Sequence, residues 1–167
     1  MRWMAIGFIA ASLAPLAAQQ PSGSVDVPAG ARVVLKAKGE GVQIYVCTAA
    51  GGASKWTLQG PDAKLLDVAG KQIGTHFAGP TWKLDDGSQV QGQLMASQPS
   101  PDAASVAWLL LRAKPGSPTG QLAAVAYIRR TDTHGGMPDA DACQNQSDGG
   151  KTVRVPYSAT YTFYAAQ

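Results

Sequence analysis

Hydrophobic and polar residues alternate with a period of two along several short segments, which is typical of β-strands. In GVQIYVC (41–47), Gln43, Tyr45 and Cys47 share one face and three apolar residues share the other. The clearest alternation is TVRVPYSATYTFYAA (152–166), which places Tyr157, Tyr161 and Phe163 on one face. Six further segments are strand candidates: ARVVLKA (31–37), SKWTL (54–58), TWKL (81–84), SQVQGQLM (88–95), VAWLLLRA (106–113) and QLAAVAYIRRT (121–131).

Turn signals separate these segments, since the chain contains 19 glycines and 11 prolines. KLDDGSQV (83–90) predicts a hairpin in which Asp85, Asp86 and Gly87 form the turn. A second turn is predicted around Glu40 in KGEG, and the main helix candidate is QGPDAKLLD (59–67). The pattern predicts an all-β fold, an antiparallel β-sandwich or small closed barrel with at most one or two short helical turns.

The first residues predict export. Residues 1–18 combine Arg2 with a short apolar run and small residues, as in a secretory signal peptide, so residues 19–167 would form a single β domain. We therefore expect a secreted or periplasmic protein. In an oxidising compartment the two cysteines, Cys47 and Cys143, would form a disulfide. Two buried thiols or two soft metal ligands remain alternatives.

The net charge and the distribution of basic residues do not indicate a charged partner. The formal net charge is +3 and the basic residues are scattered, with only Arg129 and Arg130 adjacent. Nucleic-acid surfaces normally cluster such residues, so no nucleic-acid partner is expected, and we interpret Arg129-Arg130 as a solvated strand end. No later apolar run is long enough for a transmembrane helix, so the chain is not expected to span a membrane.

Candidate chemistry centres on His76 in GTHFAGPTW (74–82). A neutral imidazole can bind a metal or move a proton, and the polar loop 133–150 offers His134, Asp139 and Asp141 as further metal ligands. No paired-histidine metal motif is present. The interpretation we favour is that His76 forms a hydrogen bond with backbone groups of the turn made by AGP.

Covalent catalysis has little support, because the chain lacks a G-x-S-x-G motif and contains only one glutamate. The sequence does not decide whether the protein is an enzyme, although the lack of a recognisable catalytic set favours a protein without catalytic activity. No cofactor is expected. The ligand-binding candidates are His76, Trp82, Tyr45 and His134. We expect a non-catalytic binding or cell-envelope module whose partner is a small molecule, a glycan or an envelope component. The alternative is a metal-binding protein or metal-dependent enzyme centred on His76.

The order of segments resembles a family known as domain of unknown function 3455. The segments that carry the likeness are GVQIYVC, WTLQGPDAKL, DVAGKQIGTHFAGPTWKLDDGS, WLLL, YIRRTDTHGGMPDADAC and YSATYTFY. The family occurs in exported bacterial and fungal proteins, and the resemblance implies no particular activity. Tyr45, His76 and Trp82 match its pattern, whereas His134 does not. Because Cys47 and Cys143 both match, the resemblance supports a disulfide between them.

Overall fold

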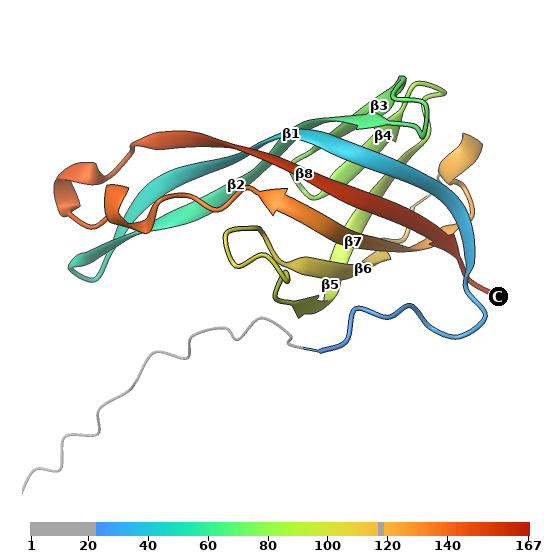
Figure 1. The fold of residues 1–167 in the computed structure, drawn as a ribbon, viewed down its shortest axis with the longest axis horizontal. Coiled ribbons are helices and arrows are strands. Elements are labelled where there is room, and N and C mark those ends of the chain that lie inside the picture. Colours follow the sequence, from blue (N-terminus) through green and yellow to red (C-terminus); the bar gives the residue numbers. More distant parts are fainter. Residues whose placement is uncertain (1–22, 117–118) are drawn as a thin grey trace, which may run out of the picture.

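Eight antiparallel strands close into one barrel in the order of the sequence (Figure 1). The structure is a computed structural model that describes residues 23–116 and 119–167. The strands are β1 (Arg32–Ala50), β2 (Ala53–Leu66), β3 (Gln72–Phe77), β4 (Thr81–Leu84), β5 (Gln89–Gln98), β6 (Trp108–Ala113), β7 (Val125–Gly135) and β8 (Thr152–Ala165). Single 3₁₀ turns occur at η1 (Gly120–Leu122), η2 (Ala140–Ala142) and η3 (Gln146–Asp148). The all-β prediction is confirmed, and of the two architectures considered the chain adopts the barrel.

Strands β1, β2 and β8 extend well beyond the other strands on one side of the barrel (Figure 1). The loop between β7 and β8 folds against this extension. Its backbone carbonyls accept hydrogen bonds from the Trp56 indole N–H, 2.7 Å to Asp139 O, and from the Ser54 hydroxyl, 2.9 Å to Asn145 O. A disulfide between Cys47 and the loop residue Cys143 adds a covalent tether.

The predicted disulfide is thereby confirmed. Cys47 lies on β1, Cys143 follows η2, and their Cα atoms are 5.7 Å apart. The predicted signal peptide, residues 1–18, lies outside the described residues. Among the residues that the structure describes, no helix is long and apolar enough to cross a membrane.

Two local predictions are wrong. Residues 59–67 are not a helix, because β2 runs through Leu66, and Glu40 lies in the middle of β1 rather than in a turn. In β2 the side chains of Pro61, Ala63 and Leu65 alternate into the barrel, the period of a strand. Gly60 has a φ of 145° beside a register shift in the pairing with β1, so it marks an irregularity inside a strand rather than a helix start.

Aromatic rings fill the closed part of the barrel. Trp82 on β4 contacts Tyr161 and Phe163 on β8 edge to face, with ring centroids 5.4 and 5.9 Å apart. Leu65 and Ile128 are fully buried in the same cluster. Outside the barrel, residues 23–31 pack on β5 and β7, where Gly23 N–H donates to Ser97 O and Asp26 pairs with Arg129.

Replacing Gly39 with alanine will destabilise the barrel. Gly39 faces the interior, where an added Cβ would lie 2.5 Å from Cε2 of Tyr161. Tyr161 cannot move aside because it is fully buried against His76 and Trp82. Overfilling of this kind costs about 1–3 kcal/mol of unfolding free energy, measurable by urea denaturation. The matched control is Gly23→Ala, whose Cβ would meet only Ala96 Cβ at 4.0 Å, and an equal loss in both variants would contradict the prediction.

Candidate functional site

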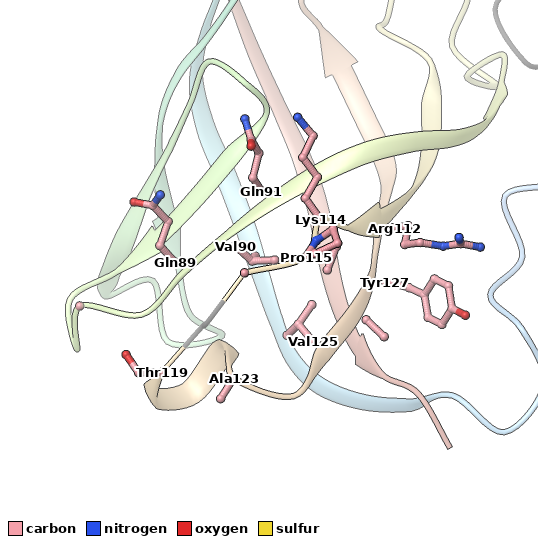
Figure 2. Close-up of a pocket in the computed structure, with 14 residues that line it drawn as sticks. Gln89, Val90, Gln91, Arg112, Lys114, Pro115, Thr119, Ala123, Val125 and Tyr127 are labelled. Carbon is pink, nitrogen blue, oxygen red and sulfur yellow. The ribbon is translucent and has the colours of Figure 1, made fainter.

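Two hollows in the protein differ in the side chains that line them. The first, of about 630 Å³, lies at the ends of β5, β6 and β7 (Figure 2). Figure 2 shows Arg112 and Tyr127 side by side, with Gln89, Gln91 and Lys114 along its other edge. None of the predicted site residues lines it.

The second hollow, of about 830 Å³, is open to solvent at its mouth and reaches buried residues inside the barrel; we call it the interior cavity. Its walls come from β1, β2, β3, β5, β6 and β7, and its mouth is bounded by the β5–β6 loop (99–107) and by Met137 of the β7–β8 loop. The apolar lining includes Leu58, Pro80, Leu94, Val106, Leu109 and Leu111. The polar lining includes Gln43, Tyr45, His76, Ser105 and Arg130.

His76 lies on β3 directly opposite Trp82 on β4, and the two rings stack with centroids 4.4 Å apart and an interplanar angle of 5°. Only 2% of His76 is exposed. Its Nδ1 lies 2.8 Å from Thr81 O, just after the 78–80 turn. Because a carbonyl can only accept, Nδ1 carries the proton and Nε2 is the free acceptor. This geometry agrees with the predicted hydrogen bond between His76 and the backbone beside the AGP turn.

The imidazole is neutral. Burial lowers the pKa of His76 to about 3; the hydrogen bond to Thr81 raises it in part, and the positive charge of Arg130 lowers it further. At neutral pH the ring therefore offers an unprotonated nitrogen and no charge.

Three buried tyrosines lie in this part of the barrel, and of these Tyr45 lines the interior cavity. The Tyr45 hydroxyl donates to Gly136 O at 2.8 Å, and the hydroxyls of Tyr157 and Tyr161 lie 3.2 Å apart. Burial raises the pKa of each, and the charge of Arg130 opposes that effect in every case. All three therefore stay neutral at physiological pH.

Two polar residues of the interior cavity were missed from the sequence. Gln43 is 1% exposed, and neither its Nε2 nor its Oε1 has a hydrogen-bond partner among the described residues. Arg130 pairs in register with Tyr161 and Leu109, so it faces the interior while Arg129 faces outward to Asp26. The interpretation of both arginines as solvated therefore fails for Arg130. Strand alternation was the available signal, since adjacent residues point to opposite faces.

The other predicted metal ligands lie away from His76. His134 is exposed on β7 opposite Ser158 and does not line the interior cavity. Asp139 and Asp141 are exposed at η2, where Asp139 Oδ1 accepts from Asp141 N–H at 3.0 Å. Within residues 23–116 and 119–167, no three histidine, cysteine or acidic residues are close enough to hold a metal ion. Of the predicted site residues, Tyr45 and His76 share the cavity wall, and Trp82 backs His76.

The fold defines the chain as an eight-stranded antiparallel β-barrel protein with an internal cavity. The chain belongs to the family described as "Protein of unknown function (DUF3455)", which matches residues 28–165 and confirms the resemblance drawn from the sequence. Neither a curated protein nor a solved structure matches the chain.

Proposed function

We propose that this protein binds one small organic molecule in the interior cavity of its barrel and acts as a non-catalytic binding module. The observation that supports this most is the composition of the cavity wall, in which leucine and valine side chains surround a few buried polar groups. Ligand sites for small molecules have this character and commonly measure about 300–1,000 Å³. The volume of about 830 Å³ lies within that range.

The mouth of the cavity supports the same proposal. Leu58 and Met137 line it, and 51% and 52% of these residues, respectively, are exposed to solvent. Exposed apolar side chains at the edge of a largely apolar cavity are a favourable entrance for a ligand with a hydrocarbon part. The Cys47–Cys143 disulfide holds the loop that carries Met137 and is typical of exported proteins, so we infer that binding occurs outside the cytoplasm.

The alternative function, a metal centre around His76, is not the one we propose. It requires His134, Asp139 or Asp141 as ligands, and these residues lie outside the cavity wall. The Nδ1–H of His76 is also engaged by Thr81 O, and its ring is stacked on Trp82. These contacts suit a residue that shapes the wall of a binding cavity.

Titration with the neutral apolar dye N-phenyl-1-naphthylamine tests the proposal. The wild-type protein should enhance the dye's fluorescence saturably, with one site per chain. Leu94→Trp should weaken binding by at least about tenfold, because the larger side chain fills the space a ligand would occupy. The matched control is Gln89→Trp, which changes an exposed residue of the first hollow on the same strand and should bind as the wild type does.

Thermal denaturation of all three proteins establishes that the variants are folded. Absence of saturable binding by the folded wild-type protein would refute the proposal. Equal weakening by Leu94→Trp and Gln89→Trp would place the dye somewhere other than the interior cavity.

A further inference from the structure

The interior cavity contains a cation with no anionic partner. The guanidinium of Arg130 donates from Nε and Nη2 to Ala107 O, at 3.0 and 2.7 Å, and a side-chain hydrogen bond from Arg130 to Tyr161 lowers the pKa of that tyrosine. Among the described residues, no carboxylate lies within ion-pair distance of it. A guanidinium carries further N–H donors beyond those engaged in these bonds, so Arg130 retains capacity to bind an acceptor in the cavity.

The groups that face Arg130 are neutral. Its charge acts on Tyr45, His76, Tyr157 and Tyr161, none of which is ionised at neutral pH. A partly buried cation among neutral groups is unfavourable, because no opposite charge compensates for the water it has lost. An anion that enters the cavity would supply that compensation.

Asp102 is the one carboxylate that lines the cavity, and it is engaged elsewhere. It is exposed at the mouth, where it accepts hydrogen bonds from Ser105 Oγ and Ala104 N–H. These hydrogen bonds lower the pKa of the Asp102 carboxyl, and among the described residues no ion pair joins it to Arg130. Asp102 therefore does not neutralise Arg130.

Gln43 supplies a second, independent observation. Its amide is fully buried in the wall of the same cavity, and both its nitrogen and its oxygen lack a hydrogen-bond partner. Leaving a buried amide unpaired costs about 1–3 kcal/mol, so such groups normally have a partner. A ligand oxygen that accepts from Gln43 Nε2 would give the nitrogen of this amide a partner and remove that part of the cost.

We propose that the ligand is an apolar monocarboxylate, whose carboxylate binds Arg130 and Gln43 while its hydrocarbon part lies along Leu94, Leu109 and Leu111. This inference rests on the proposed binding function and names its ligand class. One guanidinium and one amide offer donors for a single planar carboxylate. A phosphate or sulfate group has more acceptor oxygens, which the mainly apolar wall would leave without donors.

Displacement of N-phenyl-1-naphthylamine tests the ligand class at pH 7.5, where a carboxylic acid is ionised. The probes are decanoate, decan-1-ol and decyl sulfate, each below its critical micelle concentration. Decanoate should displace the dye at concentrations about 10- to 100-fold lower than decan-1-ol, the range expected for charge-assisted hydrogen bonds. Decyl sulfate should displace it more weakly than decanoate.

Variants locate the interaction. Arg130→Met should weaken decanoate binding about 10- to 100-fold and leave decan-1-ol within about twofold, whereas Arg130→Lys should retain part of the preference. The matched control is Arg129→Met, which removes the same charge from the outer face of β7 and should leave the decanoate preference intact. Gln43→Leu should reduce the preference without abolishing dye binding.

The outcomes separate the two proposals. Failure of the wild type to bind the dye would refute the binding function itself. Dye binding with equal displacement by decanoate and decan-1-ol would overturn only the monocarboxylate. The monocarboxylate would also be overturned if decyl sulfate bound more tightly than decanoate. The same holds if Arg130→Met weakened the binding of decanoate and of decan-1-ol equally.

Discussion

Removing the Cys47–Cys143 disulfide will lower the free energy of unfolding by about 4–5 kcal/mol. The bridge closes a loop with a sequence separation of 96, and the chain-entropy model gives this magnitude for a loop of that size, because the bridge restricts the unfolded chain. Unfolding in guanidinium chloride should show the loss both for the reduced wild type and for the Cys47→Ala/Cys143→Ala double variant. The reduced wild type keeps both buried sulfur atoms, so agreement between the two assigns the effect to the cross-link rather than to lost packing.

Loss of the disulfide should also make the loop at the mouth of the interior cavity less rigid. The tethered loop carries Met137, and its Gly136 carbonyl accepts the hydrogen bond of Tyr45. Other bonds hold this loop, among them Trp56 Nε1 to Asp139 O and Gly150 N–H to Cys47 O. A loss of unfolding free energy below about 1 kcal/mol would contradict the prediction, because the cross-link would then restrict the unfolded chain far less than its loop length implies.

Acidification will destabilise the protein through His76. Its pKa is about 3 in the folded state and about 6.5 when unfolded, so below pH 6.5 the unfolded chain binds a proton that the folded chain does not. The free energy of unfolding is unaffected by His76 above pH 6.5 and falls as the pH drops towards 3. The loss should be about 2–3 kcal/mol between pH 6.5 and pH 4.5, and about 4–5 kcal/mol once the pH reaches the folded pKa.

Urea denaturation across this pH range measures the slope. In His76→Asn the side-chain amide can still donate to Thr81 O, and the variant should be less stable overall but nearly independent of pH between 6.5 and 4.5. His134→Asn alters an exposed histidine and should retain the wild-type slope. Asp86, Asp102 and Asp148 have pKa values lowered by hydrogen bonds, so their contribution is lost only at more acidic pH. Parallel slopes for wild type and His76→Asn would contradict the assignment.

The alternation of side chains was enough to predict an all-β fold, and the 152–166 segment and the Asp85–Gly87 turn were placed correctly. The failures share a physical cause. Gly39 and Gly41 were assigned to a turn and Gly60 to the start of a helix, yet all three lie within long strands where neighbouring groups approach closely. Sequence alone cannot distinguish these two uses of glycine, because the difference lies in which partner strand comes near.

The candidate site was predicted only in part, for a related reason. Tyr45 was predicted as a site residue because it is aromatic, and His76 because histidine is rare in this chain. Both line the interior cavity. Arg130 did not, because which of two adjacent arginines faces inward depends on the register between β7 and β8. The sequence also could not predict that the Gln43 amide lacks a hydrogen-bond partner among the described residues. Whether it has one depends on which groups the other strands and the β7–β8 loop bring near it.

The pairing of the first strand with the last has a consequence for how the protein folds. Arg32 on β1 pairs with Ala165 on β8, so the ring closes only when the two most distant strands meet. Such non-local pairing costs a large amount of chain entropy before the strand contacts form and contribute favourable free energy. Proteins dominated by it fold on the millisecond-to-second scale. Until β8 joins, the backbone groups of β1 that will pair with it form an open sheet edge, so the incompletely folded chain is the state most exposed to aggregation.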